Sequence, residues 1–319
     1  MTEQPKRMLT GLQPSGSLHI GNYFGAIAPF LNFLASETAP EECYLMVADY
    51  HALTSLRDPA VLHANILDIV RAYLAAGIDP AKVVLFRQSD NPDHMELAWI
   101  FNCQVTVPFL MQAHSYKDKV AKGIEPNAGL FTYPMLMASD IALYDTDIVP
   151  VGEDQRQHLE YTREAVNKFN NHYGDTLKEP QERILPEVGV VPGIDGHKMS
   201  KSYNNTIPLF ASPEETEKAV MKIVTDSDGS FPENVYAIHR LIKTEAELEP
   251  LYRESAGRYA ELKKQLASDI NQYLAPMRDT YAEVTDDTIR SVLEAGAKHA
   301  RAASAPTLER VRTALGIAL

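Results

Sequence analysis

The sequence predicts an α/β protein built on a doubly wound parallel sheet, with a mostly helical second domain. Short apolar runs and amphipathic stretches alternate as strand, helix, strand, helix, strand over residues 7–90 of the 319. This alternation is typical of βαβ units in a parallel sheet. Beyond residue 208 the strand-like runs stop, and amphipathic helical patterns continue to the C-terminus. The second part of the chain is therefore expected to be helical.

Three continuous apolar runs, at residues 7–12, 42–49 and 82–90, are the first expected strands. Uninterrupted apolar character indicates strands that are buried on both faces of a parallel sheet. Ligands of such sheets bind at the carboxyl ends of the strands. Segments 11–16, 49–51 and 88–90 are therefore expected to meet at the binding edge, and residues 146–155 are expected to add a strand.

Helices are expected between and after these strands. Residues 18–34 carry apolar side chains at helical spacing. A second helix is expected to begin with Asp58 as N-cap and Pro59 at its first position, and to end at Gly77. The remaining helices are expected at residues 94–111, 134–144, 156–170, 214–225, 245–254, 257–274, 286–303 and 307–315.

Composition excludes several classes of protein. No apolar stretch reaches the length that spans a bilayer, and no signal core follows the polar N-terminus, so a cytoplasmic protein is expected. Cys43 and Cys103 have neither metal-ligand spacing nor a disulfide framework. The net charge of −13 argues against a general nucleic-acid binder but leaves room for local basic surfaces. The candidates for such surfaces are Arg156, Arg163, Lys168, Lys298, Arg301, Arg310 and Arg312.

The stretch GLQPSGSLHIGN, residues 11–22, places a glycine-rich turn between a strand and a helix. Backbone N–H groups and the helix dipole favour an anion at such a turn. Gly16 and Gly21 permit close approach of the backbone. His19 and Asn22 share a face of the first helical turn, and both can donate hydrogen bonds to phosphate. Taken alone, the stretch is better explained as a structural turn with a polar capping pair.

The loop GHKMSKSYNN, residues 196–205, is a second phosphate-binding candidate. Lys198 and Lys201 alternate with Ser200 and Ser202, so two ammonium groups and two hydroxyls lie close together. A solvated basic loop is the ordinary explanation of such a run. Two elements of phosphate-binding type in one acidic chain nevertheless favour a reaction of a nucleotide.

The predicted helix that contains YPMLMASDIALY carries an apolar and aromatic stripe with one charge. Tyr133, Met137, Asp140 and Tyr144 follow i, i+4, i+7, i+11 spacing, and Asp140 is the charged member. On spacing alone, an aspartate at the helix surface beside the core is the favoured interpretation.

The segments HIGN (19–22) and KMSKS (198–202) resemble the two signatures of class I aminoacyl-tRNA synthetases. With ADYHALT (48–54) and YPMLMASDIALYDTDIVPVGEDQRQHLEYTRE (133–164), the chain resembles the bacterial, tryptophan-specific family over nearly its whole length. The resemblance implies ATP-dependent attachment of L-tryptophan to tRNA(Trp). Tryptophanyl-adenylate would form with release of pyrophosphate, and its acyl group would then pass to the terminal ribose with release of AMP.

The resemblance also implies which residues hold ATP. His19, Asn22, Lys198 and Lys201 would be catalytic, stabilising the phosphates as pyrophosphate leaves. Mg²⁺ would accompany the triphosphate, held mainly by phosphate and water, so no metal site in the protein is expected. The implied ATP-binding set is Gln13, Pro14, Ser15, Gly21, Asn22, Gly152, Glu153, Asp154, Val191, Lys198, Met199, Ser200, Lys201 and Ser202.

The tryptophan site follows from the same resemblance. Asp140 would accept a hydrogen bond from the indole N–H, which only donates. Tyr133 and Gln155 would bind the α-amino group, and Met137 would pack on the ring. His51 lies at the expected binding edge, where a ligand role and a local turn-stabilising role are about equally expected. Leu9 stands where some relatives have an aromatic residue, so its role is open.

The implied organisation is a Rossmann-type catalytic domain, residues 1–207, with a helical insertion around 92–175. Residues 208–292 would form the helical domain that binds the tRNA anticodon. Helices in 293–319 would pack back on the catalytic domain. The family's enzymes are homodimers, in which one tRNA contacts both subunits.

Three alternatives compete with this interpretation. A tyrosyl-tRNA synthetase shares the fold and both signatures, but the GEDQ segment and the Met137–Asp140 spacing argue against it. A small adenylyltransferase is usually about half this length and has no helical appendage. A non-catalytic, synthetase-like binding protein is disfavoured because both phosphate signatures are intact.

Overall fold

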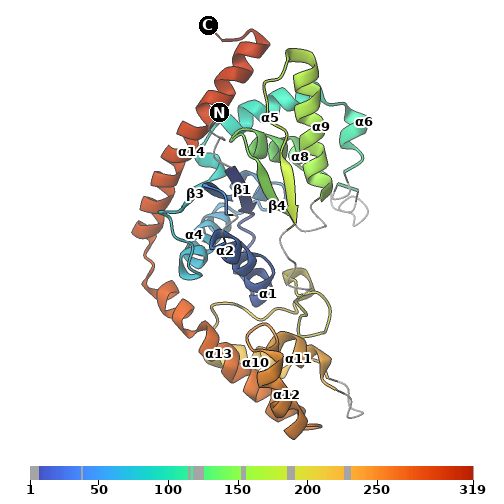
Figure 1. The fold of residues 1–319 in the computed structure, drawn as a ribbon, viewed down its shortest axis with the longest axis vertical. Coiled ribbons are helices and arrows are strands. Elements are labelled where there is room, and N and C mark those ends of the chain that lie inside the picture. Colours follow the sequence, from blue (N-terminus) through green and yellow to red (C-terminus); the bar gives the residue numbers. More distant parts are fainter. Residues whose placement is uncertain are drawn as a thin grey trace.

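The computed structural model of the chain describes residues 7–36, 39–113, 116–117, 126–151, 156–184, 191–225 and 231–318. Figure 1 shows a part that contains the sheet and a smaller group of helices, α10 to α13, at one end of the molecule. The long C-terminal helix α14 runs along the side of the sheet-containing part.

A five-stranded, fully parallel sheet forms the centre of the larger part. Its order is β3-β2-β1-β4-β5, so the chain first builds outward from β1 and then returns to the other side of β1. The order reverses between β1 and β4, which makes the carboxyl ends of these strands the expected ligand cleft. The doubly wound parallel sheet is confirmed. The strands are β1 (Arg7–Leu12), β2 (Glu42–Val47), β3 (Val83–Arg87), β4 (Ile148–Val151) and β5 (Gln181–Ile184).

The helical segment that follows β1 is continuous, as predicted, but its middle turn is wider than an α-helix. It comprises α1 (Ile20–Asn22), the π-helical η1 (Tyr23–Ile27) and α2 (Ala28–Leu34). Pro29 has no N–H with which to continue the α-helical pattern. The Ala28 N–H donates instead to the carbonyl of Tyr23, five residues back, which widens the turn.

The helix after β2 begins and ends as its sequence predicts. The Asp58 carboxylate accepts from the N–H groups of Ala60 and Val61 at 2.9 and 3.1 Å, and Pro59 occupies the first helical position. Gly77 follows the helix with φ +101°, a conformation that favours glycine. The elements here are α3 (Asp49–Ala52), α4 (Pro59–Ala75) and the 3-10 turn η2 (Gln88–Asp90).

The single helix predicted at residues 94–111 is wrong, because two helices occupy this stretch. Val105 and Thr106 are extended, and Pro108 lies in the first turn of the helix that follows. The predicted helix at 134–144 begins earlier and contains Pro134. The helices are α5 (Asp93–Gln104), α6 (Val107–Leu110), α8 (Ala128–Ala142) and α9 (Arg156–Tyr173).

Strand β5 and the short helices α3 and α11 were not predicted. Strand β5 has the sequence QERI, whose charged residues give no apolar run, and it lies at the edge of the sheet. Helix α11 (Glu233–His239) is only seven residues long. Short or edge elements carry little periodicity, so their sequences resemble loops.

The C-terminal part is helical, as predicted. It comprises α10 (Pro213–Met221), α11, α12 (Glu245–Glu254), α13 (Tyr259–Glu283) and α14 (Asp286–Leu315). The predicted break between residues 303 and 307 is wrong, because α14 continues through Pro306. Ser304 and Thr307, on either side of this proline, bond to the sheet-containing part and stabilise the helix there. Within the described residues, no helix is both long and apolar enough to cross a membrane.

Two hydrophobic cores lie on the two faces of the sheet. Strand β2 sends Cys43 and Leu45 into one core and Tyr44 and Met46 into the other, as alternation along a strand requires. The first core also contains Leu266 of α13. The helical part therefore shares a core with the helices that cover one face of the sheet.

Helix α14 covers the exposed edge of β3 at unusually short range. A Cβ atom at Gly296 would lie 1.9 Å from the carbonyl oxygen of Leu85, so only glycine fits there without a shift of the helix. Covering an edge strand also removes a site for unwanted strand pairing. Gly296 therefore sets the distance at which α14 docks.

Replacing Gly296 by alanine is expected to lower the free energy of unfolding by about 1–3 kcal/mol, because the added methyl overpacks the contact with Leu85. Gly25→Ala is the matched control, because a Cβ atom at this helical glycine would have no neighbour within 4 Å. Its substitution should be neutral or stabilising by up to about 1 kcal/mol. Urea unfolding of both variants checks this, and equal stability of G296A and wild type would contradict the close docking.

Candidate active site

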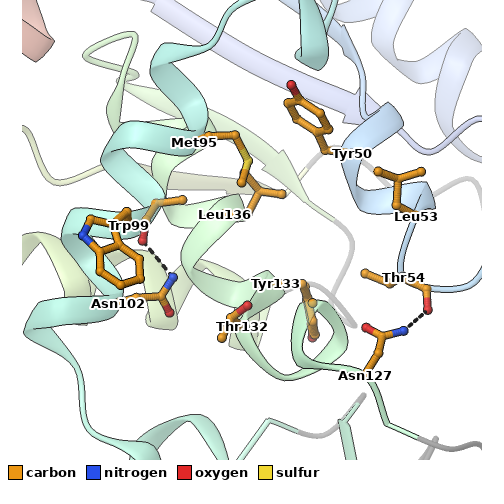
Figure 2. Close-up of a pocket in the computed structure, with 12 residues that line it drawn as sticks. Tyr50, Leu53, Thr54, Met95, Trp99, Asn102, Asn127, Thr132, Tyr133 and Leu136 are labelled. Carbon is orange, nitrogen blue, oxygen red and sulfur yellow. Dashed lines mark hydrogen bonds between the residues drawn. The ribbon is translucent and has the colours of Figure 1, made fainter.

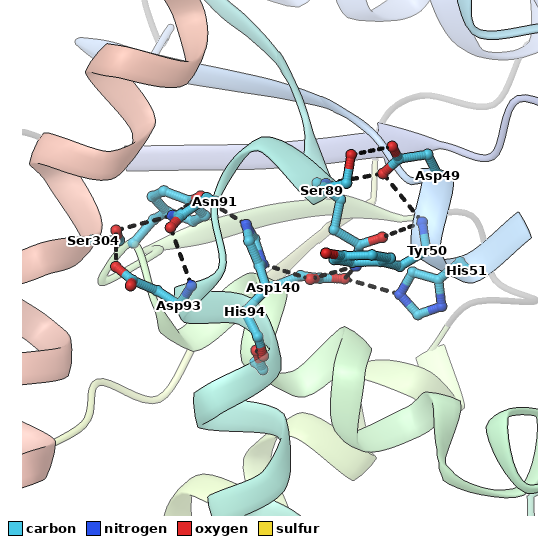
Figure 3. A network of polar contacts seen from close by, with 12 residues as sticks. Asp49, Tyr50, His51, Ser89, Asn91, Asp93, His94, Asp140 and Ser304 are labelled. Atoms are coloured by element: carbon cyan, nitrogen blue, oxygen red, sulfur yellow. Dashed lines mark hydrogen bonds and ion pairs between the residues drawn. The ribbon is translucent and has the colours of Figure 1, made fainter. Parts of the chain in front are cut away.

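The carboxyl ends of β2 and β3 are tied together at the predicted binding edge. Asp49 accepts from the backbone N–H of Ser89 at 2.9 Å and also from the Ser89 hydroxyl. The Tyr50 N–H donates to the Gln88 side-chain oxygen at 3.1 Å. Segments 49–51 and 88–90 therefore meet as expected, and Figure 3 shows the contact between Asp49 and Ser89.

His19 and Asn22 form a reciprocal cap at the start of the first helix. The Asn22 N–H donates to His19 Nδ1 at 3.2 Å, and the His19 N–H donates to Asn22 Oδ1 at 3.1 Å. The capping pair considered in the sequence analysis is thus present. Because Nδ1 accepts, the neutral ring carries its proton on Nε2, which makes that atom a donor.

His19 remains neutral over the physiological range. Its side chain is buried, and burial lowers its pKa to about 4, with a smaller contribution from the positive charge of Lys201. Both effects oppose a second positive charge at this turn. The ring can therefore serve as a neutral hydrogen-bond donor through Nε2.

The Lys198–Ser202 loop closes on the glycine-rich turn. Lys201 Nζ donates to the carbonyl oxygens of Ser15 and Gly16 at 3.2 and 2.8 Å, across 185 positions of sequence in the second case. The segment after the loop pairs with the start of the helix, where the Ile20 N–H donates to the Ile207 carbonyl at 3.0 Å. The structure thus brings the two predicted phosphate-binding segments together.

Gly21 allows the Lys198–Ser202 loop to approach the first helix closely. A Cβ there would lie 2.9 Å from His19 Nδ1 and 3.2 Å from the Cβ of Met199. Met199 is buried, and its N–H donates to the Val191 carbonyl at 2.9 Å. A side chain at position 21 would push the loop away from the helix.

Asn205 was not among the predicted site residues, although it holds the loop in shape. Its Oδ1 accepts from the Ser200 N–H at 2.7 Å, and its Nδ2 donates to Asp195 and to the Lys198 carbonyl at 2.7 and 3.1 Å. Asn205 is 1% exposed. The sequence shows a pair of asparagines here but gives no signal of which one points inward.

The remaining predicted ATP-binding residues that the structure describes lie around the same turn and loop. Ser200 Oγ accepts from the Ser202 N–H at 3.3 Å. Gln13, Ser15, Lys198, Lys201 and Ser202 are exposed, and Pro14 is buried. The predicted residues Gly152, Glu153, Asp154 and Gln155 lie outside the described residues. Among the described residues, no group of three or more His, Cys, Asp or Glu side chains is arranged to hold a metal ion.

Asp140 of α8 is a buried carboxylate that accepts hydrogen bonds from three side chains. It is 2% exposed. Oδ1 accepts from His94 Nδ1 at 2.7 Å, Oδ2 lies 2.9 Å from His51 Nε2, and Gln88 Nε2 donates to both oxygens at 2.8 and 3.0 Å. Figure 3 shows His51 and His94 on opposite sides of the carboxylate. Burial alone would raise the pKa of Asp140, but the bonds from His51 and His94 hold it at about 2.

The donors to Asp140 come from three separate segments. His51 was a predicted site residue, whereas Gln88 and His94 were not. Gln88 belongs to the predicted binding edge, which was a usable signal. His94 gave no such signal, because a histidine near the start of a predicted helix is common.

Tyr133 and Met137 lie two turns and one turn before Asp140 on α8, and both are half-buried. The Tyr133 ring meets His51 edge to face at 6.3 Å between centroids, and its hydroxyl lies 3.4 Å from His158 Nδ1. The structure therefore brings Tyr133, His51 and Asp140 together.

Leu9, whose role the sequence left open, is buried in β1 and pairs in register with Tyr44.

A shallow pocket of about 290 Å³ lies beside Tyr133 and is lined by residues of α5, of α8 and of segment 50–54. Figure 2 shows Leu53, Met95 and Trp99 around it. Their side chains are 52%, 48% and 71% exposed, respectively. We call these three side chains the apolar patch. Clustered exposed apolar groups of this kind mark interaction surfaces.

Five of the basic residues expected to contact nucleic acid also bond to other residues of the chain, and their role toward tRNA stays a prediction. Arg301 donates to the Asp90 carbonyl at 2.7 Å, and Arg312 pairs with Glu96 at 2.6 Å. These residues attach α14 to the sheet-containing part. The other internal pairs are Arg310–Asp145, Arg163–Glu160 and Lys168–Glu164.

The chain is similar to known tRNA synthetases. A family model for class I tRNA synthetases (W and Y) matches residues 1–293. The tryptophan–tRNA ligase of Fusobacterium nucleatum is 43% identical over 323 residues, which cover 98% of each chain. The crystal structure of tryptophanyl-tRNA synthetase from Campylobacter jejuni complexed with ADP and tryptophan has a TM-score of 0.91 and 41% identity, covering 97% of this chain and 99% of that chain. A tyrosyl-tRNA synthetase from Aeropyrum pernix, 20% identical with a TM-score of 0.66, shares the fold alone.

His19 is expected to titrate with a midpoint near pH 4, whereas an ordinary histidine titrates near 6.5. Because its pKa is lower in the folded state, its contribution to stability is complete above about pH 6.5 and is lost as the pH falls toward 4. An NMR titration of the histidine Cε1–H signals, assigned with His19→Asn, measures this. A His19 midpoint at or above 6.5 would show that the ring is not held neutral.

Proposed function

Because the chain belongs to the bacterial tryptophanyl-tRNA synthetases of class I, we propose that it activates L-tryptophan with ATP and transfers it to tRNA(Trp). The observation that carries this proposal is the buried Asp140 carboxylate, which lies at the same sheet edge as the joined phosphate-binding segments. The carboxylate suits an indole N–H, and the joined phosphate-binding segments suit a triphosphate.

In the first step the tryptophan carboxylate attacks the α-phosphorus of ATP, and pyrophosphate leaves. In the second, the 2′-hydroxyl of the terminal tRNA ribose takes the acyl group, and AMP leaves. Neither step needs a nucleophile from the protein. Catalysis consists of positioning the reactants and stabilising charge on the phosphates.

His19 acts here as a donor and not as a base. Its Nδ1 already accepts from the Asn22 N–H, and its low pKa keeps the ring neutral. The Nε2–H group is therefore the part of the ring available to a phosphate oxygen. Asn22, whose Oδ1 is engaged in the cap, offers its amide NH₂ in the same way.

Lys201 and Lys198 supply positive charge to the departing pyrophosphate. Lys201 Nζ now bonds two neutral carbonyl oxygens, of Ser15 and Gly16. A phosphate oxygen is a stronger acceptor for an ammonium group, so ATP would displace one or both carbonyls. Mg²⁺ would enter with the triphosphate and be held mainly by phosphate oxygens and water.

The other ATP contacts of the family extend this arrangement. The Val191 carbonyl, which accepts from the Met199 N–H, has a second lone pair that could accept from adenine. Pro14 and Ser15 would form the cradle with Gln13. Gly152 and Asp154 would contact the ribose, with Glu153 beside them in the same segment.

Asp140 distinguishes tryptophan from tyrosine and phenylalanine. His94 bonds Oδ1, His51 bonds Oδ2, and Gln88 Nε2 is shared between the two oxygens at 2.8 and 3.0 Å. An indole N–H would bond Oδ2 in place of the longer of the two Gln88 contacts. Phenylalanine has no donor and cannot form this bond to the buried charge, a difference that a site of this kind discriminates strongly. Met137 would pack on the indole, and Tyr133 with Gln155 would bind the amino group.

The helical part and the apolar patch suit the partners of this reaction. Helices α10 to α13 would contact the tRNA anticodon. A second copy of the chain would cover the patch formed by Leu53, Met95 and Trp99, giving a homodimer. Because charged tRNA is used in translation, the cytoplasm is the expected location.

ATP–pyrophosphate exchange is expected to depend on tryptophan and not on tyrosine. Asp140→Ala should raise the KM for tryptophan by about a hundredfold and change the KM for ATP little, because the lost contact is a charged hydrogen bond in a buried site. Asp79→Ala, at an exposed aspartate, is the control. Exchange that depends on tyrosine would favour the tyrosyl alternative, and no exchange with any amino acid would favour a binding protein. Equal losses for both substrates in D140A would assign Asp140 a structural role.

The chain is expected to sediment at twice its mass of 35.5 kDa. Trp99→Glu should convert it to monomers, because a charge in a buried interface core is costly. Tyr173→Glu changes an exposed aromatic residue on α9 and should leave the dimer intact. Sedimentation velocity across a concentration series compares them, and a dimeric W99E would place the interface elsewhere.

A further inference from the structure

We propose, resting on the function above, that His94 is a positioning residue that fixes the Asp140 carboxylate for the indole N–H and connects it to helix α14. The connection runs from His94 through Tyr144 and Asn91 to Ser304. Figure 3 shows this network, with Ser304 at one end and His51 at the other.

His94 is held firmly on both edges of its ring. Nδ1 lies 2.7 Å from Asp140 Oδ1, and Nε2 lies 2.8 Å from the Tyr144 hydroxyl oxygen. The backbone is held as well, because the hydroxyl of Ser139, the residue before Asp140, donates to the His94 carbonyl at 2.5 Å. His94 is fully buried, and Phe86 stacks on its ring at 6.2 Å.

The surrounding donors determine where the His94 proton lies. Asn91 Nδ2 donates to the Tyr144 hydroxyl oxygen at 3.1 Å, so the Tyr144 O–H points toward His94 Nε2. Burial raises the pKa of Tyr144, which therefore keeps its proton. Since Nε2 accepts, the neutral ring carries its proton on Nδ1 and donates it to Asp140. Asn91 thus donates to Tyr144, Tyr144 to His94, and His94 to Asp140, which remains ionised.

Helix α14 supports the segment that carries His94. Asn91 Nδ2 also donates to Ser304 Oγ at 2.9 Å, and Ser304 donates to Asp93 at 2.7 Å. The Arg301 and Arg312 bonds described above hold the same segment on either side. The C-terminal helix thus fixes the start of α5 and acts on Asp140 through His94.

The two histidines have different positions around Asp140. His51 bonds Oδ2, the oxygen with the longer Gln88 contact, and its ring faces Tyr133 of the tryptophan site. His94 bonds Oδ1 from the opposite side, away from that face. His94 therefore does not touch the substrate. It holds Oδ1 so that the carboxylate presents Oδ2 in a fixed direction.

The test compares His94→Leu with His94→Asn. Leucine and asparagine have similar shape, but the asparagine Nδ2 can replace the histidine Nδ1 as a donor to Asp140. H94L is expected to raise the tryptophan KM in the exchange assay by roughly ten- to a hundredfold, the effect of losing a hydrogen bond to a charged group. The KM for ATP should stay within about twofold. H94N should restore most of the tryptophan KM.

His239→Leu is the matched control. His239 is also fully buried and also bonds an aspartate, Asp269, at 2.8 Å, but in the helical domain. It should lower thermal stability without changing the tryptophan KM. An unchanged tryptophan KM in H94L, or equal increases in the KM of both substrates in H94L and H94N, would overturn the proposal.

Tyr144→Phe tests the same connection if H94L does not fold. It removes the hydroxyl that fixes the His94 proton and keeps the buried ring, so the tryptophan KM should rise severalfold with the ATP KM unchanged. No effect in Y144F would overturn the connection to α14. Absence of tryptophan-dependent exchange in the wild-type chain would instead contradict the proposed function. In that case, the pKa of Asp140 in wild type and H94N, followed by NMR, would still show whether His94 holds the carboxylate.

Discussion

The buried charge of Asp140 is the constraint around which the site is organised. A carboxylate that is 2% exposed must be paired inside the protein, because burying an unpaired charge is costly. Its donors lie on α3, η2 and α5, so these segments must keep fixed positions relative to α8. The parallel sheet meets this requirement by bringing the ends of β2 and β3 to one edge. Helix α14 completes it by holding the start of α5.

The phosphate-binding side depends on a different contact, the closure of the Lys198–Ser202 loop on the first helix. Gly21 permits that approach, and Asn205 gives the loop its shape. Lys201 in turn bonds the carbonyl groups of the glycine-rich turn. These carbonyls are weak partners, so under the proposed function ATP would take the lysine without breaking a salt bridge. The Asp140 cluster is thus firmly paired, whereas the loop and the turn are joined by contacts that a ligand could replace.

Features that depend on neighbouring residues were predicted from the sequence, whereas features that depend on contacts with distant residues were not. The Asp58 cap and the three apolar strands depend on neighbouring residues, so the sequence alone was sufficient. The continuation of α14 through Pro306 depends on bonds to distant segments, and the predicted break was wrong. In the site, the two signatures and Asp140 were found from motifs. His94 was missed because its role comes from a contact across 46 positions that no local pattern encodes.

The central claim is that Asp140 accepts a hydrogen bond from the indole N–H. The most direct measurement is calorimetric binding of L-tryptophan and of its benzothiophene analogue, in which sulfur replaces the indole N–H with little change in shape. The analogue is expected to bind at least about tenfold more weakly, because it cannot donate a hydrogen bond to the buried anion. Equal affinities for the two ligands would contradict the account.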